Sequence, residues 1–386
     1  MSDGSSGQGG FGDSVTEVSS TGYFARIGQS LIGMLVGFVL VAGAIALIFW
    51  NEGRAVEAIR GLKQGAAVLV EAPANHVDPA QDGRLVHLTA PLAVGQPAED
   101  PVLGIRHAGS VRLRREADMF QWVEHSQSES HTDIGGRKTT ETTYTYRQEW
   151  SENPIDSTRF HLRDGHQNPQ MAVRTATFDG HDATLGGRTL TSEVMPALTF
   201  FTPLSPPSTA HDGFVADGGQ LYRGANPNAP AIGDIRVHYS AVPTGEVSMM
   251  AAQRGSTLVA FRSGEGYVIA LAAPGAVPAA DMLREKGQEE SQLTWILRGV
   301  GFVGVLIGLL LVAAPLSTLA SVIPFLGSIV GGGVFLLALG LAIPITLVTV
   351  GVAWLAVRPL LGGGLISGAI VAYVALRMLR PSPRRA

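Results

Sequence analysis

The sequence predicts a multi-pass α-helical membrane protein with four spans and a large, mainly antiparallel β domain between the first and second spans. Three observations support this fold class. Charged residues make up 16 % of the 386 residues, whereas an ordinary soluble domain carries about 25 %. The uncharged residues gather in long runs near both ends of the chain. Between these runs, residues 52–294 hold 29 of the 32 acidic residues, so a wholly soluble protein is excluded.

The first span is predicted at 27–51. These 25 residues hold no ionisable side chain, and 13 of them are Leu, Ile, Val or Phe. Each such residue favours membrane insertion by about 0.3–0.6 kcal/mol, and about 20 apolar residues cross the hydrocarbon core. A cleaved signal peptide is the alternative, but the preceding residues carry a net negative charge and the apolar run is too long. We therefore expect a retained transmembrane helix.

The C-terminal part predicts three further spans. A run of 59 residues without charge separates Arg298 from Arg358, which is enough for two helices. Within it, Pro315 and Pro324 interrupt the apolar pattern and predict a turn. We expect the second span at 295–315, a short cytoplasmic turn at 316–326, the third span at 327–356 and a fourth span at 359–378.

Four spans would place both chain ends on one side of the membrane. A basic tail is predicted at 379–386. Positively charged residues next to a span favour the cytoplasmic side, and here they are Arg377, Arg380, Arg384 and Arg385. Residues 1–26 are then a cytoplasmic tail, which we expect to be flexible because 1–20 are rich in Gly and Ser. The domain 52–294 is extracytoplasmic in this arrangement.

The composition of 52–294 favours β structure. Thr and aromatic residues crowd 138–150, where Tyr144, Tyr146 and Trp150 fall on one face of a strand with period 2. Residues 119–125 form the predicted partner strand, and the glycines of 133–137 supply the connecting turn. Further strands are predicted at 66–71, 84–90, 110–115, 158–162, 171–178, 234–240, 246–253, 257–262 and 266–271.

Two helical segments flank these strands. Residues 52–65 place apolar side chains at helical spacing, so the first span should continue as a helix beyond the membrane. Residues 281–292 form a charged helix that leads into Trp295. Trp50 and Trp295 would then lie where two spans leave the same membrane face, which is typical of an aromatic belt.

The sequence lacks the motifs that are typical of catalytic, metal-binding and nucleic-acid-binding sites. A net charge of −4 indicates no nucleic-acid partner, and the lack of Cys excludes disulfides, zinc fingers and iron–sulfur clusters. The closest histidine pair, His161 and His166, lacks the three or four converging ligands of a metal site. The motifs HExxH, GxSxG and GxGxxG and the P-loop do not occur. We expect no catalytic, cofactor-binding or metal-binding residues.

Glycines recur at four-residue spacing in every predicted span. Small residues one turn apart let helix backbones approach closely, which favours helix association in lipid. Apart from arginines at their edges, the spans hold no charged side chain, which disfavours a transporter. We expect Arg298 and Arg358 at these edges to extend toward the membrane surface. Helix packing, within one chain or between chains, is predicted at Gly33 and Gly37, Gly304 and Gly308, Gly327 and Gly331, and Gly364 and Gly368.

Several stretches, in order along the chain, match one known family. They are NEGRA at 51–55, GRLVH at 83–87, VRLRREADMFQWVE at 111–124, the strand ending at Trp150, GHQNP at 165–169, NP at 226–227, GDIRV at 233–237 and RP at 358–359. With these motifs the chain resembles the transmembrane protein 43 family, also called LUMA. The resemblance covers most of the chain.

This resemblance implies a four-span protein with cytoplasmic ends and a luminal domain. Family members organise membrane protein complexes in the endoplasmic reticulum and inner nuclear membrane, self-associate and are connected with passive conductance. The family defines no catalytic residues. Its motif residues here are Asn51, Glu52, Gly53 and Arg54 at the membrane interface, and Arg114, Arg115, Gln121, Trp122 and Trp150 in the β domain.

The composition adds one expectation about the source. The chain has 25 Arg and 3 Lys and is rich in Ala and Gly, which indicates a bacterial protein and hence a bacterial inner membrane rather than the endoplasmic reticulum or inner nuclear membrane. At the interface motif, Glu52 and Arg54 could form a charge pair that fixes helix depth and the docking angle of the domain. They could equally be the first residues to face water.

We therefore predict an integral membrane scaffold that self-associates and holds membrane protein complexes through its β domain. The expected partners are the lipid bilayer, other membrane proteins and further copies of the chain, without nucleic acid. A subunit of a passive channel or transporter is the first alternative. A membrane-bound hydrolase is the second alternative, and it would need a converging catalytic site in the β domain.

Overall fold

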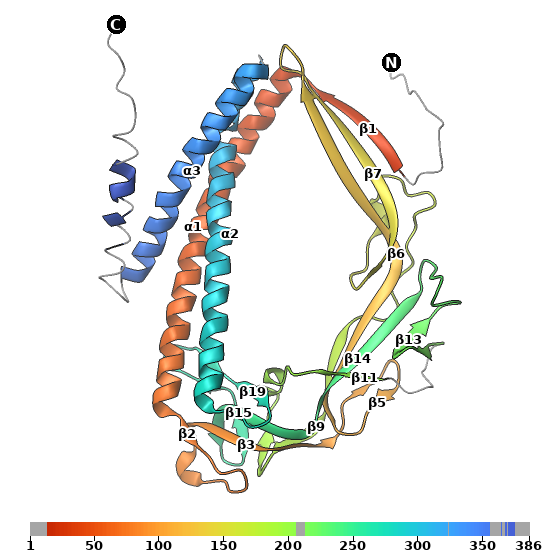
Figure 1. The fold of residues 1–386 in the computed structure, drawn as a ribbon, viewed down its shortest axis with the longest axis vertical. Coiled ribbons are helices and arrows are strands. Elements are labelled where there is room, and N and C mark those ends of the chain that lie inside the picture. Colours follow the sequence, from red (N-terminus) through yellow and green to blue (C-terminus); the bar gives the residue numbers. More distant parts are fainter. Residues whose placement is uncertain are drawn as a thin grey trace.

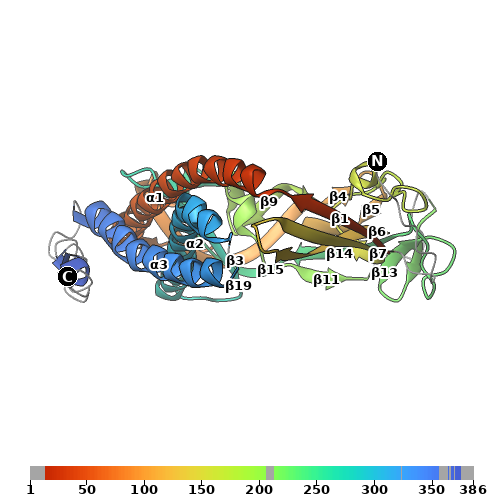
Figure 2. The same ribbon diagram turned by 90° about the horizontal axis from the view of Figure 1, so that it is seen from above.

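The computed structural model describes residues 14–205, 213–322 and 324–355, together with 364, 367–368 and 370–374. Three long helices lie side by side on one side of the molecule, and strands rise on the other side (Figure 1). A view from above shows the helices as a bundle from which the strands extend in one direction (Figure 2).

The helices are α1 (Tyr23–Val68), α2 (Ala279–Ala320) and α3 (Pro324–Leu355). At 1.5 Å per residue, the 46 residues of α1 extend about 69 Å, far more than the hydrocarbon core of about 30 Å. The apolar residues 27–51 therefore form one half of α1, and the charged residues 52–68 continue it beyond the membrane. This continuation confirms the helix predicted at 52–65, and the charged helix predicted at 281–292 lies within α2.

The prediction of four spans is wrong for this structure. Among the described residues, three helices are long and apolar enough to cross a membrane. The predicted fourth span, 359–378, lies mostly outside the described residues. The described residues within it, 364, 367–368 and 370–374, are helical, but they are too few to count as a span among the described residues.

The connection between α2 and α3 is shorter than predicted. Helix α2 continues through Pro315 to Ala320, and α3 begins at Pro324. Proline breaks helices in water, but apolar helices tolerate it because neighbouring groups satisfy the freed carbonyl. The predicted turn at 316–326 is therefore reduced to the few residues between the two helices.

The first sheet contains the longest strands. Asp133 N donates to Arg137 O at 2.9 Å, which closes the predicted hairpin turn and confirms it. From Val111 to Gln121, every second residue of the 23-residue strand β6 is buried, because one face packs on the core. The eight strands are β1 (Ser14–Thr21), β6 (Ser110–Thr132), β7 (Lys138–Ser151), β8 (Ala176–Asp179), β11 (Thr202–Leu204), β12 (Val215–Asp217), β13 (Gln220–Arg223) and β14 (Ile235–Pro243).

The second sheet closes on itself. Strands β3, β9, β10, β16 and β15 pair in that order, and β15 pairs again with β3, which makes a five-stranded barrel with a buried apolar interior. Closure removes exposed sheet edges. The sheet consists of β2 (Val70–Glu71), β3 (Leu85–Gln96), β9 (His181–Leu185), β10 (Arg188–Leu190), β15 (Gly245–Arg254), β16 (Thr257–Val259) and β19 (Leu271–Pro274).

Two short hairpins complete the β structure. They are β4 (Glu99–Asp100) with β5 (Ile105–Arg106), and β17 (Phe261–Arg262) with β18 (Val268–Ile269).

Some predicted strands are wrong. The predicted strand at 158–162 is a 3₁₀ turn at Ser157–Arg159 followed by irregular chain. The strand at 171–178 is limited to β8, and the strand at 66–71 is mostly the end of α1. Apolar residues such as Met171 and Val173 are buried from loops, so their hydrophobicity does not indicate a strand.

The tail predicted to be flexible is ordered in part. Residues Ser14–Thr21 form β1, which pairs antiparallel with β7 from Ser14↔Thr145 to Thr21↔Lys138. The β-branched residues Val15, Thr16 and Val18 favour a strand at this position, although 1–20 as a whole are rich in Gly and Ser. Strand β1 leads through Gly22 directly into α1.

The strands 14–21, 138–145 and 125–132 therefore form a three-stranded ribbon, which we call the polar ribbon. Its only apolar or aromatic residues are Val15, Val18 and Tyr144. The hairpin turn at its tip meets the N-terminal end of α1 and the C-terminal end of α2 (Figure 1). There, Arg26 Nη1 donates to Gly136 O at 2.6 Å, and Gly135 N donates to Val322 O at 3.1 Å.

Candidate functional site

The three helices converge where the apolar halves of α1 and α2 meet their charged halves, at the C-terminal end of α3. Helix α1 contributes Asn51, Glu52 and Arg54, α2 contributes Glu290, Thr294 and Arg298, and α3 contributes Trp354. The three α2 residues are spaced by four and so share one helix face. Tyr267 joins from the β17–β18 hairpin. We call these eight residues the interface network.

At the centre of the network, Glu52 is fully buried. Arg298 holds its carboxylate with two parallel bonds, Nε–Oε1 at 2.5 Å and Nη2–Oε2 at 2.8 Å. The indole Nε1 of Trp354 also donates to Glu52 Oε2. A buried carboxylate is costly unless it is paired and hydrogen-bonded, so Glu52 requires α2 and α3 in these positions.

A second charge pair lies further from the apolar segments. Arg54 Nη1 pairs with Glu290 Oε2, and Arg54 Nη2 donates to Thr294 Oγ1 at 3.2 Å. Tyr267 OH donates to Glu290 Oε1 at 3.0 Å. A Cβ at Gly61 of α1 would overlap the Tyr267 side chain, so this glycine lets the hairpin approach the helix. The second pair thereby joins the β domain to both helices.

The protonation of this second pair follows from its surroundings. Burial opposes the charged form of Glu290, but the hydrogen bonds from Arg54 and Tyr267, together with the charge of Lys286, outweigh it and lower the pKa of Glu290. Burial, reinforced by the Glu290 carboxylate, raises the pKa of Tyr267. Glu290 is therefore ionised and Tyr267 neutral at physiological pH.

The predicted interface motif is part of this network, but its members pair differently from the hypothesis. Glu52 and Arg54 do not pair with each other, because residues two apart on a helix point in different directions. Each pairs instead with an α2 residue. Asn51 Nδ2 donates to Thr294 O at 3.1 Å, while Gly53 faces open space.

The extension of Arg298 toward the membrane surface stays a prediction. Its side chain is 17 % exposed and bonded to Glu52, a pairing that was not predicted. The signal was present in the sequence, because Glu52 and Arg298 are the first charges beside two long uncharged runs that leave the same membrane face. Arg358 lies outside the described residues. Trp50 and Trp295 are exposed, and their role in an aromatic belt stays a prediction.

The predicted glycine pairs have different surroundings. A Cβ on Gly37 would lie 2.6 Å from Gly308 O, and one on Gly308 would lie 2.9 Å from Gly37 O, so α1 and α2 cross here within one chain. Gly304 faces Ala44, whereas Gly33 only reaches Leu311. The remaining positions, Gly331, Gly364 and Gly368, have no atom within 4 Å of an added Cβ; the surroundings of Gly327 are not described.

In the β domain, all five predicted motif residues have structural partners. Gln121 is fully buried, donates to Asn153 O at 2.8 Å and accepts from Ile155 N at 3.0 Å. The ring of Trp122 packs edge-on against His166, and Trp150 packs against Phe120, Tyr222 and Arg236. Arg114 is an outward-facing residue that pairs with Glu116.

Arg115 belongs to a buried cluster whose other members the sequence did not reveal. It donates to Asp100 Oδ2 at 2.5 Å, and Tyr239 OH donates to the same oxygen at 2.5 Å. Burial and the Asp100 carboxylate raise the pKa of Tyr239, so it stays neutral. The members come from β4, β6 and β14; pairing of β14 with β6 places Tyr239 opposite Arg115, and the separate β4–β5 hairpin brings Asp100 to them. Because these buried side chains hydrogen-bond to one another, the cluster has a structural role.

Neither arrangement resembles a catalytic or metal centre. Within the described part of the chain, no three His, Cys, Asp or Glu residues come close enough to hold a metal ion. The apolar helices with a β-rich domain define the class of an integral membrane protein.

Comparisons with known proteins identify the family. Residues 119–359 match the family model described as Transmembrane protein 43. The chain is 32 % identical to transmembrane protein 43 of Rattus norvegicus over 96 % of both chains, and 33 % identical to that of Homo sapiens over 89 % of this chain and 88 % of the relative. The homolog of Drosophila melanogaster is 29 % identical over 88 % and 93 %. No solved structure matches.

The chain therefore belongs to the transmembrane protein 43 family, which confirms the resemblance and the integral membrane localisation. The family's name refers to a transmembrane protein and to no reaction. The bacterial source stays a prediction.

Proposed function

We propose that this protein is a self-associating membrane scaffold whose β domain holds other membrane proteins. In the assembly, the apolar helix faces lie toward lipid and the polar ribbon lies toward the centre. The observation behind this proposal is the attachment of the polar ribbon to the N-terminal end of α1. This end is separated from the charged half of α1 by the apolar residues 27–51.

Lipid cannot satisfy the hydrogen-bonding groups of such a ribbon. Each unsatisfied backbone group in hydrocarbon costs several kcal/mol, and strands occur at membrane depth only where protein or water covers them. A bilayer around residues 27–51 would otherwise separate β1 from β7, because these strands lie on opposite sides of α1 in the chain. Neighbouring copies would shield the polar ribbon from lipid while the helices remain in contact with it.

The interface network suits a scaffold. It joins all three helices to one another and, through Tyr267, to the β domain. A domain held by buried charge pairs keeps a defined position relative to the membrane, as a partner-binding platform requires. This rigid connection is consistent with the scaffold proposal and needs no catalytic group.

The test uses the lack of cysteine in the chain. Glu141→Cys places one thiol on the exposed face of the polar ribbon, and Glu246→Cys places one on the exposed surface of the barrel as a matched control. After oxidation in native membranes, we expect covalent dimers for Glu141→Cys and monomers for Glu246→Cys. Monomers for both, together with one chain per particle in native mass spectrometry, would overturn the proposal.

The same observation favours a passive channel as a second candidate. A polar ribbon at the centre of an assembly could line a water-filled path, the other setting in which strands occur at membrane depth. Conductance of the purified protein in liposomes tests this candidate. Oligomers without conductance would be consistent with the scaffold proposal and would contradict the channel proposal.

A further inference from the structure

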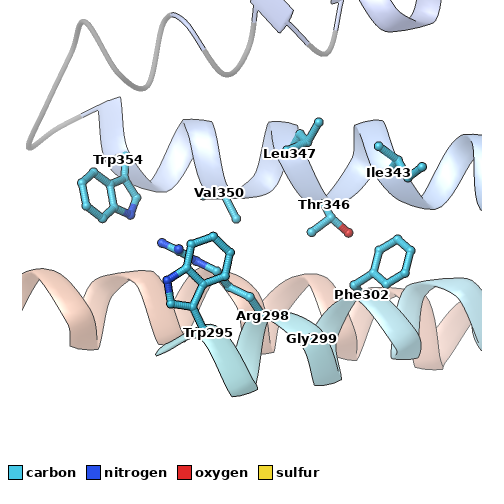
Figure 3. Close-up of a pocket in the computed structure, with 9 residues that line it drawn as sticks. All are labelled: Trp295, Arg298, Gly299, Phe302, Ile343, Thr346, Leu347, Val350 and Trp354. Atoms are coloured by element: carbon cyan, nitrogen blue, oxygen red, sulfur yellow. The ribbon is translucent and has the colours of Figure 1, made fainter. Parts of the chain in front are cut away.

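An apolar groove of about 580 Å³ runs between α2 and α3, next to the interface network. Trp295, Arg298 and Trp354 form its rim, and its inner wall is apolar (Figure 3). The inner wall consists of Gly299, Phe302, Ile343, Thr346, Leu347 and Val350.

The residues that the structure describes leave this groove unfilled. A Cβ at Gly299 would meet no atom within 4 Å, so α2 presents a gap where α3 presents side chains. The hydroxyl oxygen of Thr346 is buried in the wall and has no hydrogen-bond partner among the described residues. Close-packed interiors rarely tolerate such space, which indicates that another molecule occupies it.

The surroundings determine the chemistry of that molecule. The groove lies between the apolar half of α2 and the uncharged helix α3, where the neighbouring exposed side chains, such as Val300 and Ile296, are apolar as well. The medium in contact with it is therefore the bilayer. Tryptophans at the rim are typical of the membrane–water boundary, so the groove runs from the headgroup level into the hydrocarbon.

The rim carries no net charge. The guanidinium of Arg298 lies 4.7 Å from the Trp295 ring centroid, and its charge is balanced by Glu52. A site of this kind discriminates by the shape of the apolar chain and not by the charge of the headgroup.

We propose that this groove binds one acyl chain of a bilayer phospholipid, with the headgroup at the tryptophan rim. The bound chain fills the space opposite Gly299 and joins α2 to α3. Zwitterionic and anionic phospholipids occupy the groove to the same extent.

The experiment uses the full chain in phosphatidylcholine vesicles that contain phosphatidylcholine with a diazirine in its acyl chain. Irradiation, digestion and mass spectrometry map the crosslinks. We expect them to concentrate in 295–302 and 343–354. The variant Gly299→Leu fills the groove and should reduce these crosslinks several-fold. Gly43→Leu adds the same side chain at another open helix position and should leave them unchanged.

A second variant and a second lipid complete the test. Thr346→Leu should reduce the crosslinks like Gly299→Leu, and photoreactive phosphatidylglycerol should reproduce the phosphatidylcholine pattern. Crosslinks spread evenly over all exposed apolar residues would overturn the proposal. So would groove crosslinks that Gly299→Leu leaves unchanged, or protein–protein crosslinks showing that residues 364–374 of the chain cover the groove.

Discussion

The fully buried carboxylate of Glu52 concentrates the electrostatic cost of the fold in one residue. Two bonds from Arg298 and one from Trp354 satisfy it. Breaking a buried pair leaves an uncompensated charge, whereas replacing both partners by apolar residues is often neutral. The network is therefore more sensitive to single substitutions than to matched double substitutions.

This asymmetry gives the first prediction. Arg298→Met should destabilise the protein by about 3–5 kcal/mol because it leaves Glu52 buried and unpaired. The double variant Glu52→Leu with Arg298→Met should recover much of that loss. The free energy of unfolding in mild detergent provides the measurement. Additive losses in the double variant would show that the two residues are not coupled.

The second prediction concerns pH and Glu290. Because its pKa is lower in the folded state than the ordinary value of 4.5, its stabilising effect is complete above pH 4.5 and is lost as the pH falls through the folded-state pKa. The wild type should therefore lose stability in this acidic range more steeply than Glu290→Gln. Thermal unfolding across pH 3–7 would measure it, with the exposed Glu285→Gln as a control. Equal slopes for all three proteins would contradict the prediction.

At the scale of elements, α1 and α2 cross where two glycines remove all side-chain bulk. Gly37 and Gly308 bring the backbones together, and lipid-embedded helices associate through such packing because no hydrophobic force drives them together. Strand β6 illustrates the opposite case, since its pairing and burial follow directly from alternating residues.

The third prediction tests the helix crossing. Gly37→Leu should cost about 1–3 kcal/mol or more through overpacking, because even its Cβ would collide with the backbone of α2. Gly43→Leu, on the open side of α1, should have almost no effect. Thermal unfolding of both variants in lipid nanodiscs measures this loss of stability. Similar losses in both would show that the effect does not depend on the helix crossing.

At the scale of the whole molecule, the polar ribbon connects the β domain to the end of α1 beyond its apolar half. This connection turns the molecule into a closed loop of helices, barrel and strands (Figure 1). Its arrangement relative to the bilayer underlies both candidate functions, so the pairing of β1 with β7 is the decisive feature.

The fourth prediction tests that pairing in membranes. Val18 lies opposite Glu141 in the register, so Val18→Cys with Glu141→Cys should form an intrachain disulfide, identified by peptide mass spectrometry of the monomer. Val18→Cys with Thr145→Cys should not, because Thr145 pairs with Ser14 four positions away. Absence of the first disulfide in vesicles would mean that lipid separates the strands, and the central position of the polar ribbon would lose its support.

The sequence by itself determined the properties that depend on local composition. Long uncharged runs revealed the apolar helices, because lipid disfavours charge along a whole run of residues. The Thr- and Tyr-rich pattern of 138–150 revealed the central hairpin, because a half-buried sheet imposes alternation on neighbouring residues. The family motifs were equally readable. Counting uncharged residues predicted four spans, whereas the described residues contain three helices long and apolar enough to cross a membrane.

Only the tertiary structure decided which distant residues meet. The α2 partners of Glu52 and Arg54 lie more than 230 residues away. Arg115 meets Tyr239 through strand pairing and Asp100 through the packing of a separate hairpin. The order of β1 depends on β7, because an edge strand is stable only against its neighbour. Such contacts depend on chain topology and close packing, which no window of neighbouring residues encodes.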